Sequence, residues 1–507
     1  MPLIGNQRTF ALELQPVVPS WETRYPPERA AWAGTAIWVG HRNLCAHVPS
    51  GSDAIENYFY VPLGPIADWM IRCFPAIEFE ERAANFPTTR HLHDSAERWW
   101  RTQPASGLSE DAWFDLRDEW WSRHFLRAGA EGAILPDLGF VRDDEELVIS
   151  WAFPQHVGDD QVTMLSTPGD FGIPWTDGYA VLRKFISEVA NWLRGGPAAE
   201  AYAWASEQDP LPSVKPPLSV AVELFTARST RELERLFGVA EFDAVMRSLQ
   251  LDSASRDPAA SPECQILRDL SPALPSEVGA LLVELGEETQ HSKPEALGKW
   301  RAGRAVASDV ARPAHTVEEA GQLAASEIRR ELGLDGQPIQ DVRAVLARFG
   351  LPCEHSPTGV GDRMVVAARE GGSLQARTLR DERTETPWGR RFEECRALGH
   401  VLLDPIRAGA IGAGSGPFAQ ETRRRRSGAF AAELLLPATA LAAASNHAPD
   451  GVADDRAFQT LLEQYRVGAR TAANQLYNRG WLSSTDVRDQ LIDRFSATSP
   501  ATALADE

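Results

Sequence analysis

The residues with the clearest chemical potential lie close together in the segment Glu393–Asp404. His400 and Asp404 are four residues apart, a spacing that puts two side chains on one face of a helix. Zinc accepts imidazole nitrogens and carboxylates as ligands, and Glu393 or Glu394, a turn or two upstream, is a potential third ligand. One interpretation of this segment is therefore a zinc site built around His400.

Two neighbouring residues weigh against that interpretation. Pro405 disfavours helical geometry at the residue before it, so Asp404 is expected at the end of the helix rather than within it. Arg396 lies one turn before His400, and its guanidinium stays protonated and has no lone pair to offer a metal. The site therefore lacks a clear third ligand and a general base.

The helix that must position these groups is predicted over Arg391–Asp404. Apolar residues recur there every three or four positions, which is typical of a helix with one buried face. Gly399 lies beside this buried stripe and would allow another element to pack closely. The stripe is formed by Phe392, Cys395, Leu398 and Leu402.

This helix resembles the active-site helix of the ImmA/IrrE metallopeptidase family. In that family two histidines four apart bind zinc, and the glutamate between them takes a proton from zinc-bound water. The resemblance puts Arg396 at the position of the first zinc histidine and Ala397 at the position of the general-base glutamate. Of these three motif residues, only the second histidine, His400, is kept. The matching runs are Arg391-Phe392, Leu398–His400 and the apolar Val401–Leu403.

A second segment, Phe430–Pro437, resembles the Phe-Ala-Ala-x-Leu-Leu-Met-Pro signature of the same family. The family's third ligand is a glutamate six residues before that phenylalanine, where this chain has Arg424 within the basic run Arg423–Arg426. The resemblance thus implies a zincin-like domain that has kept its fold and lost its metal, with no catalytic residue. Working members of the family cleave repressors or regulators.

The resemblance also brings Arg396, His400 and Arg424 together, and three such groups are suited to binding a small anion. The alternative is that Arg396 pairs with Glu393 or Glu394 and that the basic run is solvated. The expected function is a regulatory, sensor or interaction module with a protein partner, in stress response or phage defence. The competing expectation is an active zinc metallopeptidase with unusual ligands around His400; otherwise no cofactor is expected.

The composition of the 507-residue chain is that of a globular protein of several domains, with 43 % hydrophobic and 24 % charged residues. The net charge of −20 disfavours broad adhesion to nucleic acids or membranes. The five cysteines are scattered without C-x-x-C spacing, which fits a reducing cytoplasm. The longest apolar stretch is interrupted by Glu433 and Pro437, so no membrane span is expected.

The N-terminal part, residues 1–206, contains 13 of the 16 tryptophans and is predicted to be an α+β domain of unknown function with its own core. An acidic turn joins two of its predicted strands into a hairpin. The predicted strands are Thr35–Val39, Tyr58–Val61, Leu138–Val141 and Leu147–Trp151. The predicted helices are Pro65–Phe74, Asp94–Arg101, Asp111–Arg127 and Tyr179–Leu193.

Residues 207–314 are predicted to be a proline-rich linker followed by a helical module, in which Ser229 and Glu232 form a capping box. Residues 315–445 are the ImmA/IrrE-like domain, where two helices precede a small sheet. The predicted helices are Thr316–Leu332 and Ile339–Phe349, and the predicted strands are Cys353–Ser356, Met364–Ala368 and Leu374–Thr378.

The tail, residues 446–495, is predicted to be helical and resembles the short helix-turn-helix that follows the catalytic part in this family. A second helix that reads DNA needs basic and amide side chains, and Arg470, Asn474, Gln475 and Arg479 are of these types. The tail is nevertheless acidic overall, which favours a helical pair that packs on its own domain. Binding of nucleic acid is therefore not expected.

Overall fold

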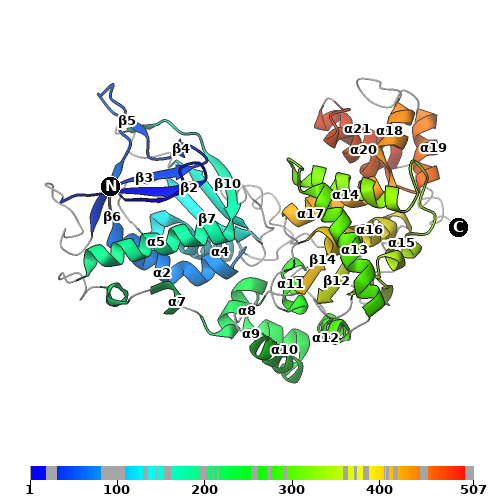
Figure 1. Ribbon diagram of the computed structural model, residues 1–507, viewed down its shortest axis with the longest axis horizontal. Coiled ribbons are helices and arrows are strands. Elements are labelled where there is room, and N and C mark those ends of the chain that lie inside the picture. Colours follow the sequence, from blue (N-terminus) through cyan, green and yellow to red (C-terminus); the bar gives the residue numbers. More distant parts are fainter. Residues whose placement is uncertain are drawn as a thin grey trace. The chain divides into compact units, whose positions relative to one another are not determined.

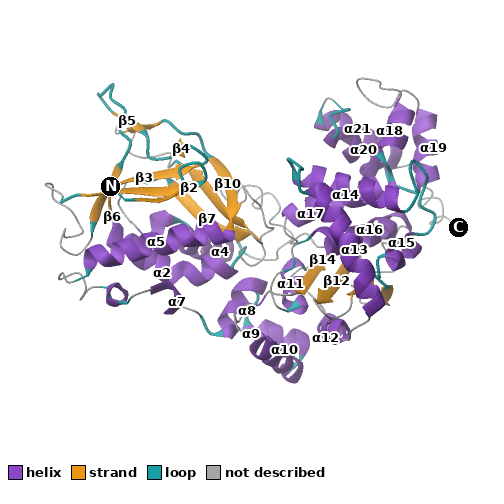
Figure 2. Ribbon diagram, viewed as in Figure 1, coloured by secondary structure: helices purple, strands orange, loops and turns teal. Residues whose placement is uncertain are grey.

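The chain folds into two units, Met1–Arg228 and Ser229–Glu507, each with its own core. Together they form a mixed α+β protein with several separate sheets (Figure 1; Figure 2). The computed structural model describes residues 2–18, 31–81, 109–129, 135–143, 146–153, 162–194, 202–207, 210–213, 216–252, 258, 261–270, 276–290, 294–357, 363–369, 374–380, 387–404, 406, 410–414, 421–445, 455–482 and 484–496.

Strands of the first unit form one five-stranded sheet and two smaller ones. The largest has the order β1-β2-β3-β4, with β6 also paired to β3, and is made of β1 (Leu3–Gly5), β2 (Phe10–Pro16), β3 (Trp32–Val39), β4 (Arg42–Asn43) and β6 (Phe59–Pro62). The second has the order β10 (Gly169–Pro174), β8 (Glu146–Ala152) and β7 (Asp137–Asp143). The third pairs β5 (His47–Pro49) with β9 (Val162–Met164).

Helices α2 (Leu63–Phe79) and α5 (Trp175–Leu193) pack on each other and on these strands, as Figure 1 shows. The predicted strands, the β7–β8 hairpin and the helices around residues 65–74, 111–127 and 179–193 are confirmed. The helix predicted at 94–101 lies outside the described residues. The other helical elements are α4 (Glu110–His124), η2 (Leu126–Gly129), η3 (Ala203–Ser206), α7 (Pro210–Ser213) and α8 (Leu218–Thr226).

Many of the tryptophans belong to the core of this unit, as predicted from their number in residues 1–206. An aromatic side chain buries a large apolar area, so a few of them contribute much of the stability of a core. The buried tryptophans among the described residues of the first unit are Trp32, Trp69, Trp120, Trp151, Trp175 and Trp204.

The second unit contains a four-stranded sheet with the order β11-β13-β12-β14. The first three strands were predicted, and β11 is parallel to β13 whereas the other pairs are antiparallel. The fourth, β14, was missed because Ala-Ile-Gly-Ala-Gly has little β-propensity. The strands are β11 (Cys353–Pro357), β12 (Arg363–Arg369), β13 (Leu374–Arg380) and β14 (Ala410–Gly414).

The helices of the second unit from Pro294 onward share one core with this sheet (Figure 1; Figure 2). The Ser229–Glu232 capping box is confirmed, and Thr316 caps α14 as predicted. The helices are α9 (Thr230–Phe237), α10 (Val239–Asp252), α11 (Pro262–Asp269), α12 (Ser276–Gln290), α13 (Pro294–Ala311), α14 (Val317–Glu331), α15 (Val342–Arg348), α16 (Pro387–Leu403), α17 (Glu421–Leu435), α18 (Ala438–Ser445), α19 (Asp455–Tyr465), α20 (Ala469–Asn478) and α21 (Thr485–Ser496).

The division into two units falls within the segment 207–314. Helix α8 packs on α2 of the first unit, whereas α11 packs on β14 and α13 packs on α14 and α16. The tail is likewise part of the second unit, since Phe458, Leu476 and Phe495 belong to the same core as Leu398 of α16. Composition indicates where apolar faces lie but not which partner buries them.

Candidate functional site

Helix α16 is held between α13 and α17 in the second unit. Its predicted stripe is buried at Cys395, Leu398 and Leu402. Gly399 allows close packing as predicted, because a Cβ at this position would lie 3.1 Å from the ring of Phe430 on α17. At the C-terminal end, the Trp300 indole donates a hydrogen bond of 2.8 Å to the Val401 carbonyl, which has no partner within the helix.

Asp404 is the centre of a buried ion-pair cluster at the end of α16. Its side chain is 0 % exposed. Oδ2 accepts a hydrogen bond of 2.7 Å from Nδ1 of His400, and Oδ1 accepts one of 2.6 Å from Nη2 of Arg426. Arg423 places Nε 3.5 Å from Oδ2. We refer to His400, Asp404, Arg423 and Arg426 as the Asp404 cluster.

The cluster stabilises the ionised form of Asp404. Burial by itself raises the pKa of this carboxyl group, but the charges of His400, Arg423 and Arg426 outweigh burial and hold the pKa well below its usual range. Asp404 thus carries a full negative charge in the interior. Removing the carboxylate would take away the counter-charge that it provides to Arg423 and Arg426.

Arg396, His400 and Arg424 do not converge on one point, so the anion site predicted from these three residues is not formed. Arg396 pairs with Glu393 one turn earlier, with Nη1 at 3.0 Å from Oε1, and His400 pairs with Asp404. Arg424 is exposed. Helix geometry explains the difference, because Arg423 and Arg426, three apart, face α16 while Arg424 points about 100° away from Arg423.

The residues present do not fit a zinc site. His400 directs Nδ1 to Asp404 and leaves Nε2 buried without a hydrogen-bond partner among the described residues, which is the arrangement of a metal-binding histidine. No second ligand accompanies it: Glu393 pairs with Arg396, and Glu394 lies 3.4 Å from Nε of Arg343. Within the described ranges there is no group of three histidine, cysteine, aspartate or glutamate residues that could hold a metal.

Helix α11 covers the edge of the sheet at β14. The sequence did not predict this contact. Gln265 uses both ends of its amide there: Nε2 donates to the Ala410 carbonyl at 3.3 Å, and Oε1 accepts from the Gly412 amide at 2.9 Å. Asp269 accepts from the Gly414 amide at 3.0 Å. Side chains of α11 therefore occupy backbone groups of β14 that a further strand would otherwise use.

Replacing Gln265 with alanine should lower the free energy of unfolding of the second unit by roughly 2 kcal/mol, since it leaves two buried backbone groups of β14 without partners. Hydrogen exchange at the Gly412 amide should accelerate, as measured by mass spectrometry. The exposed Gln464 provides the control, because its replacement with alanine should change stability by no more than about 0.5 kcal/mol. Equal effects of both substitutions would contradict the role of Gln265.

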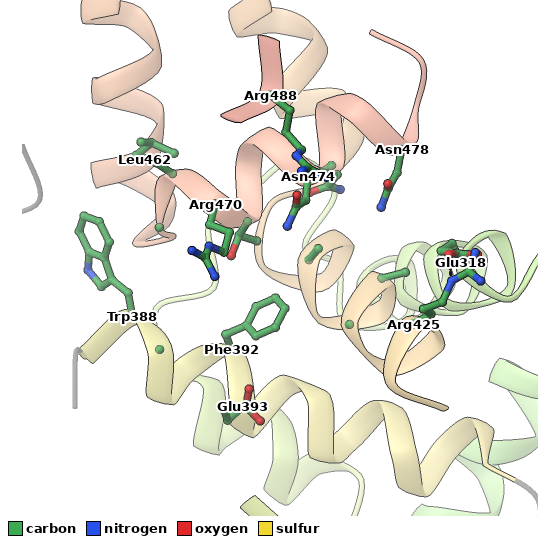
Figure 3. Close-up of a pocket in the computed structure, with 18 of the residues that line it drawn as sticks. Glu318, Trp388, Phe392, Glu393, Arg425, Leu462, Arg470, Asn474, Asn478 and Arg488 are labelled. Carbon is green, nitrogen blue, oxygen red and sulfur yellow. Dashed lines mark hydrogen bonds and ion pairs between the residues drawn. The ribbon is translucent and has the colours of Figure 1, made fainter. Parts of the chain in front are cut away.

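The candidate DNA-reading residues of α20 divide into two groups. Gln475 and Arg479 point into the unit and each donate a hydrogen bond of 2.7 Å to Oε2 of the buried Glu433 on α17. Arg470 and Asn474 line a pocket between α20, α16 and α17 (Figure 3). The α19–α20 pair thus packs on its own unit, which is the alternative that the acidic tail favoured.

The sequence did not indicate this pocket in the second unit. Besides Arg470 and Asn474 it is lined by Arg424 from α17 and by Trp388 and Phe392 from the N-terminal part of α16. These residues are distributed over more than eighty positions of sequence. Only the packing of the tail on α16 and α17 brings them together.

None of the helices in the described parts of the chain is long and apolar enough to cross a membrane. Comparison with known proteins finds no family model that matches the chain and no curated protein that matches it. The resemblance to ImmA/IrrE peptidases therefore rests on the residues quoted above and on the order of elements around them.

Proposed function

We propose that the second unit contains a catalytically degenerate, zincin-like ImmA/IrrE domain that acts as a regulatory, sensor or interaction module. The Asp404 cluster is the observation that carries this proposal. His400, the one zinc ligand left by the resemblance, is tied into a buried ion-pair network. Arg396 and Arg424 stand at the other two ligand positions, and neither can donate a lone pair to a metal.

The covered sheet edge supports the same proposal. An extended peptide substrate can bind to an open edge strand through backbone hydrogen bonds. On β14 the Ala410 carbonyl and the Gly412 and Gly414 amides are already bonded to α11, so a peptide would first have to displace this helix. Regulation through a protein partner, in a stress or phage-defence setting, is the role that the resemblance suggests.

One observation favours the competing proposal, an active zinc peptidase with unusual ligands. Nε2 of His400 is buried, lacks a partner among the described residues, and belongs to a ring oriented by a carboxylate. A single nitrogen does not hold zinc, so this alternative requires two further ligands that the described ranges do not bring to His400. Metal analysis distinguishes the two proposals.

The purified full chain, dialysed in metal-free buffer, should contain well below one zinc per molecule. A chelator should leave the melting temperature unchanged, because structural zinc would contribute folding energy directly. Elemental analysis and calorimetry measure the two quantities. Zinc near one per chain that is lost in His400→Ala would overturn the proposal and establish the competing one.

A further inference from the structure

The pocket shown in Figure 3 has the size of a small-molecule site. Its volume is about 830 Å³, within the range of about 300–1,000 Å³ typical of ligand pockets. It lies between the N-terminal part of α16, the middle of α17 and the helices α19–α21. One wall of the pocket is basic and polar, and the other is aromatic.

Two arginines in the pocket have no counter-charge. Arg424 and Arg470 pair with no carboxylate among the described residues. The two lining carboxylates are already used, since Glu318 pairs with Arg425 and Glu393 with Arg396. In a chain with a net charge of −20, a pocket with two unmatched guanidiniums is a local region of positive potential. Arginine forks are well suited to phosphate oxygens.

Helix α20 adds polar groups to this basic wall. Arg470, Asn474 and Asn478 are spaced by four residues and extend from one face of α20 toward α16 and α17 (Figure 3). Gly468 begins the helix without a side-chain cap and lines the pocket, so the positive end of the helix dipole lies at the pocket wall. Each asparagine amide can both donate and accept a hydrogen bond.

The opposite wall is aromatic. Trp388 and Phe392 are one turn apart on α16, and both are half-buried at the pocket surface (Figure 3). Leu462 of α19 extends this apolar wall. The faces of tryptophan and phenylalanine rings stack on planar ring systems such as nucleobases.

We propose that this pocket binds a nucleotide, with the phosphate held by Arg424, Arg470 and the start of α20, and the base held against Trp388 and Phe392. A phosphorylated ligand with a planar ring matches both walls, whereas a purely apolar ligand would leave the guanidiniums desolvated. The site faces α16 at its N-terminal part, away from the Asp404 cluster at the other end. Nucleotide binding and zinc content are separate measurements, so this proposal and the proposed function can fail independently.

Titration calorimetry of the full chain with AMP, GMP, CMP and UMP tests the proposal, with adenosine and inorganic phosphate as separate probes. At least one nucleotide should bind more tightly than inorganic phosphate or adenosine, and inorganic phosphate should compete with it. Arg470→Ala should weaken binding by on the order of tenfold to a hundredfold, the effect of losing charge-assisted hydrogen bonds. Trp388→Ala should weaken binding of the nucleotide but not of inorganic phosphate.

The matched control is Arg312→Ala, which removes an arginine that is 78 % exposed, directly follows α13 and does not line the pocket. It should leave the affinity unchanged. Circular dichroism and melting curves establish that each variant is folded, and the exposed position of Arg470 makes its loss harmless to the core. The proposal is overturned if none of the four nucleotides binds, or if Arg470→Ala and Arg312→Ala bind equally well.

Discussion

Replacing Asp404 with asparagine should lower the free energy of unfolding of the second unit by roughly 3–5 kcal/mol, the cost of breaking a buried ion pair from one side. Asparagine keeps the volume of the side chain but removes its charge. Arg423, 1 % exposed, and Arg426, 16 % exposed, would then lose their counter-charge in the interior. Calorimetry and denaturant titration measure the change, and hydrogen exchange along α16 locates it.

The control for this substitution is Asp309→Asn. Asp309 forms an ion pair with Arg312 on the surface of α13, where both side chains are more than two-thirds exposed, so its loss should cost no more than about 0.5 kcal/mol. A change below about 1 kcal/mol in Asp404→Asn would mean that the Asp404 cluster contributes little to stability. Such a small change would also remove the main support for a structural role of His400.

The same cluster predicts a dependence of stability on pH. The pKa of Asp404 is lower in the folded chain than in the unfolded chain, where an aspartate titrates near about 3.9. The contribution of the ionised carboxylate is therefore fully present above that value and is lost as the pH falls through it toward the folded pKa. The stability difference between the wild type and Asp404→Asn should shrink as the pH falls below about 4.

The second large effect is expected from Glu433→Ala. This buried carboxylate of α17 joins three parts of the unit, accepting hydrogen bonds from Ser326 of α14 at 3.0 Å and from Gln475 and Arg479 of α20 at 2.7 Å each. Alanine leaves the guanidinium of Arg479, which is 22 % exposed, without the counter-charge of Glu433, so we expect a loss of roughly 3 kcal/mol in the free energy of unfolding. Hydrogen exchange should increase along α20, because Glu433 is its main polar attachment to α17.

Glu463→Ala is the matched control, since Glu463 is exposed on α19 and accepts only a surface hydrogen bond from Gln459. It should change stability by about 0.5 kcal/mol or less. A double-mutant cycle of Glu433→Ala with Arg479→Ala should give a coupling energy between the two residues of at least about 1 kcal/mol. Additive effects of the two substitutions would show that the ion pair does not attach α20.

A weaker attachment of α20 should also change the geometry of the pocket, because Arg470 and Asn474 are on the helix that Gln475 and Arg479 attach to Glu433. Gln475 and Arg479 bond to Glu433, whereas Arg470 and Asn474 line the pocket, which Gln475 also borders. This division was not predictable from the sequence, in which all four side chains are equally suited to a DNA-reading helix.

The sequence by itself determined the local structure of much of this protein. The capping box at Ser229, the Thr316 cap and the β7–β8 hairpin depend on residues a few positions apart, and all were found as expected. Helix α16 was also predicted, but it begins at Pro387, four residues before the predicted start. Gly399 was likewise correctly identified as a point of close packing. Propensity, capping and periodicity act within one or two turns, so they can be read from neighbouring residues.

Only the tertiary structure decided which groups meet. It paired Asp404 with Arg423 and Arg426, placed α11 along β14, and brought Arg470 to the pocket beside Trp388. The periodicity of a helix shows that one face is buried but does not identify the partner that buries it. A charged residue can bind zinc, an anion or another side chain, and the counter-charge that decides among them comes from distant positions in the chain.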